Sequence, residues 1–359
     1  MSAVVAAWVL ASSAMAIQSP RADPAADALR YGAVVQQYLR GDGDEAIREV
    51  LTWNRGALSE AVGFVEEDES GKEGLPQTRA VVAAFPAAVM LHTEAALYLN
   101  EKDDDEGAGA HWGYARRLAE LPPRTKPQEA FLRAWYHAVG LFCLGSFGVD
   151  NAIVFLQRGL QRFPDDRPIA LALGQAYEAR GTYRNGRVPS VQPNLSSDAK
   201  KDLRTAESFY RELLSQDPQL WEARLRIGRC AWLGGRPEAA LAEFQRTGSE
   251  ADDARLRYLA HLFTGDLYRR QSLVPEARQE FARAVELWPD GQTAALGLAE
   301  ALHTLGERTE AGAALQAAIV ERAGTPRLDP YHVYHFGYRA EQRRLLEAVR
   351  DLARASSNR

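Results

Sequence analysis

A fixed spacing recurs through the second half of the chain and constrains its fold more than any other feature. A small residue is followed twelve residues later by an alanine, and a large apolar or aromatic residue stands four residues beyond that alanine. In one case an insert of twenty residues lengthens the first interval. Such self-similarity predicts stacked helix pairs, each of which buries its apolar face only against its neighbours. The sets are Gly140, Ala152 and Leu156; Gly174, Ala206 and Tyr210; Gly228, Ala240 and Phe244; Gly265, Ala277 and Phe281; and Ala299, Ala311 and Leu315.

Each residue type in this pattern has a physical reason. The small residue lets two helix backbones approach closely, where a larger side chain would overpack the contact. Gly234–Gly235 and Gly306 indicate turns between the two helices of a pair. Two units have no proline at their end; in the unit of Phe244 the polar run Thr247–Glu250 is predicted to be the loop, and after the last unit Pro326 comes a little later. In three other units a proline, which cannot continue a helix, ends the second helix: Pro164, Pro218 and Pro289.

The pattern resembles the tetratricopeptide repeat, whose signature reads G-x-x-Y, then A-x-x-x-F, then P. Gly174–Tyr177 and Gly265–Tyr268 carry the first part, and Ala277 to Phe281 with Pro289 carries the rest. The resemblance covers roughly residues 127–322. It implies an all-α fold, a right-handed α-solenoid of stacked helix-turn-helix repeats.

The repeat pattern divides the chain into four parts. Residues 1–16 are a candidate signal peptide, residues 17–125 a divergent helical region of tetratricopeptide character, and residues 126–322 the array. Residues 323–359 hold an aromatic segment and a capping helix, Ala340–Ala355, which is expected to cover the end of the stack.

Three segments interrupt this helical pattern. Acidic loops are predicted at Glu66–Glu69 and Asp103–Glu106, on either side of a helical pattern over Val81–Asn100. A further helical pattern runs through Ala108–Leu121. Residues 182–200 form an insert of the array, and their glycine, proline and serine content predicts a loop.

The first residues resemble a secretory signal. Ala3–Leu10 is apolar, and Ala14–Ala16 is an A-x-A cleavage site, which predicts a chain exported to the periplasm or secreted, as in a bacterial protein. No lysine or arginine precedes Arg21, so the alternative is an uncleaved membrane anchor. A membrane is a partner only in that second case.

Composition excludes several functional classes. A net charge of −5 and a pI near 5.9 argue against a nucleic-acid partner. The sequence contains no H-E-x-x-H, P-loop, G-x-S-x-G or C-x-x-C motif, so we expect no catalytic site, cofactor or metal. Cys143 and Cys230 fall in non-adjacent repeats, too far apart for a disulfide.

The resemblance implies that a protein or peptide partner binds the groove lined by the first helix of each pair. An arginine there is able to pair with an acidic group of the partner through two hydrogen bonds. Earlier units add His137, Leu141, Gln175 and Glu178 to this face. The predicted groove residues are Leu225, Arg229, Trp232, Leu262, Asp266, Arg269, Glu300 and His303.

Two alternatives to a non-catalytic scaffold stay open. One is an enzyme, or an enzyme's accessory subunit, with its site in the divergent N-terminal region, at His92 and Glu94 or at His111 near Asp105, or in the C-terminal segment, at His332 and His335. The last two histidines, three residues apart, share a helix face but supply only half of a metal site. The other alternative is self-assembly through the last helix or the 182–200 insert.

Overall fold

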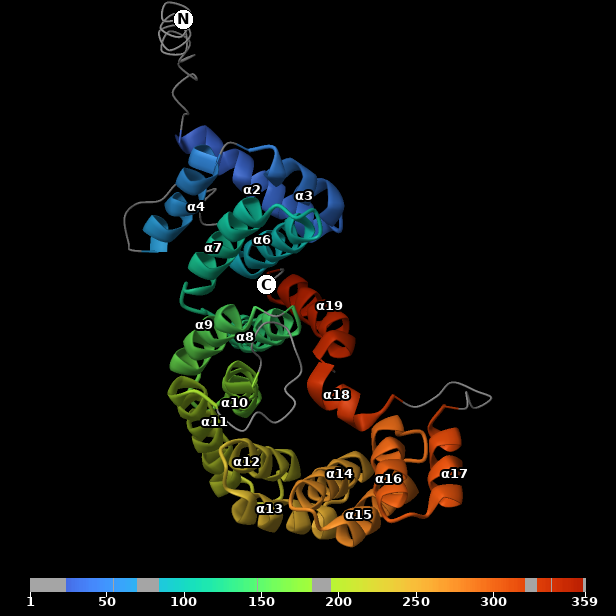
Figure 1. Cartoon of the computed structure of the whole chain (residues 1–359). Helices are drawn as coiled ribbons and strands as arrows, with labels where there is room; N and C mark the ends of the chain where they lie inside the picture. The colour runs from blue at the N-terminus through green and yellow to red at the C-terminus, as the bar shows by residue number, and fades with distance from the viewer. Residues whose placement is uncertain are drawn as a thin grey trace, which may run out of the picture. The chain divides into compact units, whose positions relative to one another are not determined.

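The computed structural model describes residues 24–53, 55–69, 84–146, 148–182, 195–319, 328–336 and 338–357, and these fold into helices with no strand among them (Figure 1). Two compact units form: the N-terminal unit, residues 1–132 with 350–359, and the array unit, residues 133–349. The candidate signal peptide, residues 1–16, lies outside the described residues. None of the described helices has the length and apolar character that crossing a membrane requires.

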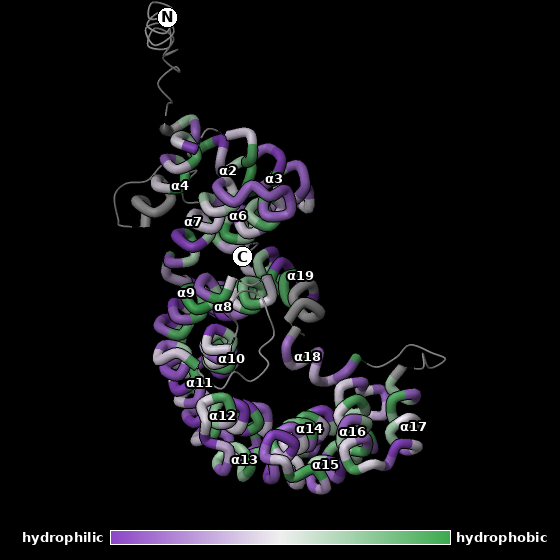
Figure 2. The backbone as a smooth tube through the Cα atoms, in the orientation of Figure 1, coloured by the Kyte–Doolittle hydropathy of each residue, from purple (hydrophilic) through white to green (hydrophobic). Residues whose placement is uncertain are grey.

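Five consecutive helix pairs confirm the predicted right-handed α-solenoid. In each pair the second helix runs back along the first, and the next pair stacks on it (Figure 1). Figure 2 shows that these helices carry both polar and apolar residues along their turns, as helices buried on one side do. The pairs are α8 (Lys126–Gly145) and α9 (Val149–Arg162); α10 (Arg167–Thr182) and α11 (Ser197–Gln216); α12 (Trp221–Leu233) and α13 (Pro237–Glu250); α14 (Ala254–Arg270) and α15 (Val274–Leu287); and α16 (Gln292–Thr304) and α17 (Arg308–Ile319).

The small residues of the pattern lie where the two helices of a pair touch. A Cβ atom added at Gly174 would come within 2.5 Å of the Tyr210 ring, and one at Gly228 within 2.6 Å of the Phe244 ring. At Gly265 the same atom would lie 2.8 Å from Phe281. The glycine of the first helix is therefore packed against the aromatic residue four positions after the alanine of the second. The predicted close approach is confirmed.

Helix ends also follow the sequence signals. The second helices α9, α11 and α15 end two residues before Pro164, Pro218 and Pro289, as predicted. Gly235 and Gly306 adopt φ angles of 79° and 84° in the turns between paired helices, a conformation that costs glycine little.

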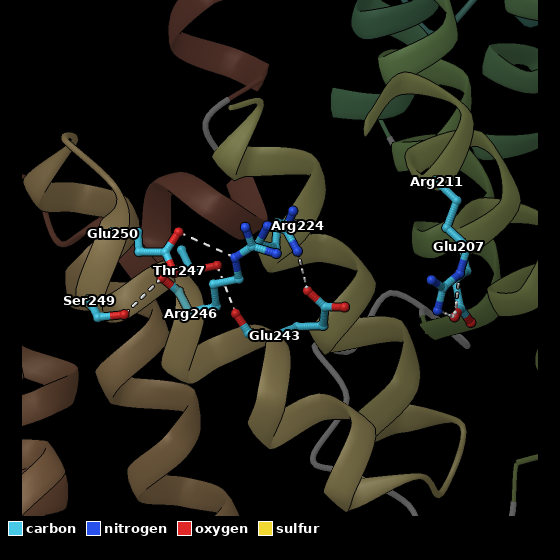
Figure 3. A network of polar contacts seen from close by, with 8 residues as sticks. All are labelled: Glu207, Arg211, Arg224, Glu243, Arg246, Thr247, Ser249 and Glu250. Carbon is cyan, nitrogen blue, oxygen red and sulfur yellow. Dashed lines mark hydrogen bonds and ion pairs between the residues drawn. The ribbon is translucent and has the colours of Figure 1, made fainter. Parts of the chain in front are cut away.

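The prediction of a loop at Thr247–Glu250 is wrong, because these residues form the last turn of α13. Thr247 is buried and donates its hydroxyl to the Glu243 carbonyl oxygen at 2.9 Å, and the Ser249 hydroxyl lies 3.2 Å from the Arg246 carbonyl oxygen (Figure 3). Ser249 also donates to the Gln245 carbonyl oxygen at 2.9 Å. Arg246 pairs with Glu250 one turn later. These bonds satisfy the hydroxyls within the helix, so polar composition alone does not end it.

An ion pair joins the two helices of the third pair, α12 and α13. Arg224 on α12 reaches Glu243 on α13 with an N–O distance of 2.9 Å, and both side chains are mostly buried (Figure 3). On α11, Glu207 accepts from Arg211 in the same view. It also accepts from Arg236, which lies between α12 and α13.

The N-terminal unit consists of shorter helices. They are α2 (Pro24–Arg40), α3 (Gly43–Leu51), α4 (Arg55–Glu69), α6 (Phe85–Asn100) and α7 (Asp105–Ala119). The last two match the helical patterns expected over Val81–Asn100 and Ala108–Leu121. The end of α19 (Tyr338–Ser357) joins this unit, where Arg350 donates to Glu94 on α6 at 2.6 Å.

Both predicted acidic loops need correction. Glu66–Glu69 is the last turn of α4, and the Asp103–Glu106 loop is shorter than expected. Asp104 caps α7, accepting from the Gly107 N–H at 2.9 Å, and Asp105 and Glu106 lie in the first helical turn. Carboxylates are stabilising there because the N–H groups of a helix start point toward them.

The insert and the C-terminal segment are partly described. Of the predicted 182–200 insert, residues 183–194 lie outside the described residues, and Ser197–Lys200 form the first turn of α11, capped by Ser196. The aromatic segment forms a short helix, α18 (Pro330–Phe336), and α19 follows it. We expected the final helix over the end of the array, whereas its Arg350 contacts α6. Cys143 and Cys230 are free and buried.

We predict that Gly228→Ala destabilises the array, whereas Gly312→Ala does not. The new methyl at Gly228 meets the fixed Phe244 ring, and overpacking of this kind costs about 1–3 kcal/mol. Gly312 lies on α17 with open space around it, so alanine there stabilises the helix by about 0.5–1 kcal/mol. Urea unfolding followed by circular dichroism compares the two variants. Equal midpoints would contradict the close approach at Gly228.

Candidate protein-binding surface

The first helices of the pairs form the concave face of the array unit, and α18 lies against that face. Figure 1 shows α8, α10, α12 and α14 on the inner side of the arc, with α9, α11, α13 and α15 outside them. A cavity of about 470 Å³ lies between these inner helices and α18. Its apolar lining includes Leu141, Leu171, Leu220, Leu256, Leu259 and Val333.

A buried carboxylate connects four helices beside this cavity. Glu178 on α10 accepts from the Tyr210 hydroxyl of α11 at 2.9 Å and from Nη1 of Arg226 on α12 at 3.1 Å. It also accepts from the Tyr334 hydroxyl of α18 at 2.5 Å. Burial, reinforced by the Glu178 charge, raises the pKa of both tyrosines well above the usual range, so both phenols stay protonated and donate.

Arg226 has two roles in this network. It forms a second ion pair with Glu222 at 3.0 Å, and its guanidinium lies 4.5 Å from the centre of the Tyr334 ring. Only 4 % of the residue is exposed, so the positive charge is held by these neighbours in place of water.

Asp329 fixes the start of α18. One carboxylate oxygen accepts from the Tyr258 hydroxyl and from the Tyr331 backbone N–H, both at 2.9 Å. The other oxygen accepts from the Thr293 N–H at the beginning of α16, at 2.8 Å. A single side chain therefore caps two helices and links both to α14.

The aromatic side chains of α18 pack on α14. The Tyr334 and Tyr331 rings lie 5.5 and 6.2 Å from the Phe263 ring, in edge-to-face arrangements. His335 packs edge-on against both tyrosines. Burial, with a smaller effect of the Arg229 and Arg226 guanidinium groups, holds the pKa of His335 well below its usual range. The imidazole is thus an uncharged packing group.

Comparison with known families identifies the repeats. The tetratricopeptide repeat family matches residues 199–261, 249–291 and 262–327. Residues 199–327 are tetratricopeptide repeats. The tetratricopeptide array therefore provides a protein-interaction scaffold, since stacked repeats of this kind present extended concave surfaces to partners.

Several solved structures are similar to part of this chain. A crystal structure of MamA shares 18% identity, covers 50% of this chain and 92% of its own, and has a TM-score of 0.39. The 41-end fragment of MamA from Desulfovibrio magneticus RS-1 is 17% identical, covers 52% of this chain and 93% of its own, and has a TM-score of 0.39. PilF of Pseudomonas aeruginosa is 16% identical, covers 63% of this chain and 90% of its own, and has a TM-score of 0.43. No curated protein matches the chain.

Four of the predicted groove residues are buried within the tetratricopeptide array. Leu225, Trp232 and Leu262 belong to one apolar cluster, with 0 to 6 % of each residue exposed. Arg229 is 3 % exposed, and its guanidinium lies 4.7 Å from the Trp232 ring and 4.9 Å from the Phe263 ring. In this conformation these side chains pack between helices and have little surface to offer a partner.

The other four predicted groove residues are more accessible. Arg269 on α14 pairs with Asp266 and, at 3.1 Å, with Glu300 on α16. His303 is exposed one turn after Glu300. The structure therefore brings Asp266, Arg269 and Glu300 together in a network of surface ion pairs. None of the eight predicted groove residues lines the cavity.

The two earlier units of the tetratricopeptide array supply the predicted residues that do line the cavity. They are His137, Leu141 and Gln175, while Glu178 forms the buried network beside it. The sequence interpretation missed Arg226, Asp329 and Tyr334. The sequence does contain a signal for Asp329 and Tyr334. Asp329-Pro330 is a pattern typical of a helix start, and Tyr331 and Tyr334 are three residues apart, on one face of the helix.

The histidines of the alternative enzyme hypothesis form a buried pair in the N-terminal unit. Nδ1 of His92 lies 2.9 Å from Nδ1 of His111, and Nε2 of His92 lies 3.0 Å from the Tyr31 hydroxyl. His92 is fully buried and His111 is 6 % exposed. Glu94 is engaged with Tyr38 and Arg350. Among the described residues, no group of three or more metal-ligating side chains occurs.

We predict that Glu178→Ala destabilises the array far more than Glu222→Ala does. Both carboxylates pair with Arg226, but Glu178 is buried and Glu222 is 38 % exposed. Removal of the buried partner costs about 3–5 kcal/mol, and removal of the exposed one about 0–1 kcal/mol. Urea unfolding measures both losses. A similar loss in the two variants would contradict the central role of Glu178.

We predict that the N-terminal unit loses stability in acid because of the histidine pair. Burial and the neighbouring imidazole hold the pKa of His92 well below the usual value of 6.5. Burial, then the Arg55 charge, lowers the pKa of His111 to about 4. The folded state thus prefers neutral histidines. The contribution of the neutral histidines to the free energy of unfolding is fully present above pH 6.5. It declines by on the order of 3 kcal/mol as the pH falls toward 4.

Hydrogen exchange of the α6 and α7 amides between pH 7.5 and 4 measures this decline, after correction for the intrinsic exchange rate. In the double variant His92→Gln/His111→Gln the dependence becomes flat. His303→Gln, at an exposed position of the array, is the control and keeps the wild-type profile. A wild-type profile in the double variant would contradict the assignment.

Proposed function

We propose that this chain is a non-catalytic scaffold that holds a segment of a partner protein in the cavity of its tetratricopeptide array. The observation that carries the proposal is the cavity itself, which lies on the concave face and has α18 already seated along one wall. Leu171, Leu220 and Leu256 are partly exposed within it, on three different repeats. Its volume of about 470 Å³ suits the apolar side chains of a peptide segment.

The rim of the cavity supports binding of a polypeptide. Arg167 faces Asp217 at 3.7 Å, and Arg255 pairs with Asp253 at 2.7 Å. Both arginines are about half exposed, so these pairs are weak and open to exchange with charged groups of a partner. An apolar centre with a charged, solvated rim is the general layout of protein interfaces.

The chemistry of the cavity favours binding over catalysis. Its described lining contains no serine, threonine, cysteine or lysine that would act as a nucleophile. The pKa of His137, the histidine of the lining, is lowered by burial. Tyr334 is committed to Glu178. The described lining of this cavity therefore gives no support to the enzyme hypothesis.

Export remains a proposal from the sequence. The apolar run Ala3–Leu10 and the A-x-A site ending at Ala16 support it. Mass spectrometry of the chain taken from its native cells decides the point. A chain that begins at Ile17 supports export, and one that begins at Met1 contradicts cleavage.

Site-specific photo-cross-linking tests the binding surface. A photoreactive phenylalanine replaces Leu256 or Leu171 in the cavity, or Leu315 on α17, which is 43 % exposed and lies elsewhere. We expect a partner adduct from the two cavity positions and none from Leu315. Adducts from Leu315 alone, or from no position, would place binding outside the cavity.

A second substitution shows whether an adduct reflects binding. Leu220 lines the cavity at the N-cap of α12, where aspartate is a favoured residue. Leu220→Asp therefore keeps the helix but puts a charge into the apolar centre, which weakens a central contact by about 2 kcal/mol or more. The adduct at Leu256 should disappear in this variant. An undiminished adduct would contradict cavity binding.

A further inference from the structure

The segment 328–336, which we call the tyrosine segment, contacts the concave face as a bound peptide would. Its partners come from four different helices, and the bond from Tyr334 to Glu178 spans 156 positions of the sequence. We infer that the concave face recognises an acidic and tyrosine-containing helical segment of the form D-P-Y-x-x-Y, and that the tyrosine segment is an internal copy of what the partner presents. The inference rests on the proposed function and names the chemistry of the partner.

The first recognition element is a carboxylate clamp. The Tyr258 hydroxyl and the Thr293 N–H converge on Asp329 at 2.9 and 2.8 Å, from α14 and from the start of α16. Tyr258 is fully buried, and its hydroxyl would lie 2.6 Å from a Cβ atom at Gly291. The clamp is therefore fixed in place, and it offers two donors to an anionic side chain at a helix N-terminus.

The second element is an aromatic socket. Phe263 packs edge-to-face with both tyrosines, and the Arg226 guanidinium lies over the face of Tyr334 at 4.5 Å. A planar cation and an aromatic edge together favour an aromatic ring over an aliphatic side chain.

The third element selects tyrosine over phenylalanine. Glu178 is buried, and it accepts the Tyr334 hydroxyl at 2.5 Å. A site built to accept a hydroxyl discriminates against an analogue without it, because the buried acceptor loses a partner. The distance along the chain from the clamp to this acceptor then sets the spacing of the motif, with aspartate five positions before the second tyrosine.

The tyrosine segment also forms part of the cavity wall. Pro330, Val333 and Tyr334 line the cavity together with Leu171 and Leu256. Displacement of the segment would join the cavity to the clamp and the socket in one longer groove. A partner segment with this motif competes with the chain's own copy, which the covalent link holds at an effective concentration on the order of 1 mM.

A peptide-binding measurement on the full chain tests the inference. The probe is a fluorescently labelled peptide of residues 328–336. The protein is the wild type or the variant Asp329→Ala/Tyr334→Ala, in which the internal copy is weakened. If the free peptide has a Kd of about 10 μM, the internal copy reduces its apparent affinity for the wild type about 100-fold. We expect the double variant to recover that factor in fluorescence anisotropy.

Matched controls define the chemistry. A peptide with Asp329→Ala, or one with Tyr334→Phe, should bind the double variant about ten-fold more weakly, because each loses a hydrogen bond to a buried or charged group. His332→Ala in the protein changes an exposed residue of α18 and should leave binding at the wild-type level. Circular dichroism and the melting temperature establish that each variant is folded.

Two outcomes overturn the inference. A folded double variant that does not bind the peptide shows that the face does not recognise the motif. Equal affinity of the wild type and the double variant shows that the peptide binds elsewhere. Should the double variant unfold, Tyr334→Phe in the protein keeps the ring and removes only the hydroxyl. It should then raise peptide affinity about ten-fold, and no gain overturns the inference.

The result is separable from the proposed function. Partner adducts at Leu256 without peptide binding would support the scaffold and refute the motif. Peptide binding without adducts in cells would support the motif and refute a partner held in the cavity.

Discussion

The array depends on one repeated contact, a glycine in the first helix of a pair against an aromatic ring in the second. Gly174, Gly228 and Gly265 leave no room for a methyl group, so the two helices approach until backbone and ring touch. The contact fixes how far apart paired helices lie, and the next pair stacks on the surface that results. Since each repeat touches mainly its neighbours, small errors at this contact would be passed along the whole array. The regular spacing of the first helices on the concave face follows from this repeated contact.

A different interaction gives the concave face its individual character. Glu178 accepts hydrogen bonds from Tyr210 of its own repeat, from Arg226 of the next repeat and from Tyr334 of the C-terminal segment. A buried charge of this kind adds little stability compared with apolar packing, but it is strongly selective for the groups that surround it. The regular repeat thus provides the shape of the concave face, and this irregular polar centre binds the C-terminal segment to it through Tyr334.

The sequence was sufficient for the architecture but not for the surface. Period, glycine contacts and proline stops predicted the five helix pairs, because these features act locally and recur. Polar composition misled the interpretation at Thr247–Glu250 and Glu66–Glu69, because both runs form the last turn of a helix. Arg229 and Trp232 were predicted from their register on the first helix, and they are buried because the C-terminal segment and the next helix pack nearby. Contacts between residues as distant as Glu178 and Tyr334 leave no periodic trace in a single sequence.

The Asp329 carboxylate has a consequence for how the array ends. It closes the start of α16 through the Thr293 N–H, while it also begins α18 and holds Tyr258. The seating of α18 on the concave face is therefore coupled, through this one carboxylate, to the start of the fifth helix pair. A ligand that brings its own carboxylate would preserve that helix start, and one that lacks it would leave the N–H groups of α16 open to water. By reciprocity, loosening of the fifth pair would weaken whatever occupies the face by the same factor. A partner that displaced α18 would then also influence, through Asp329 and the start of α16, how far the ordered array extends.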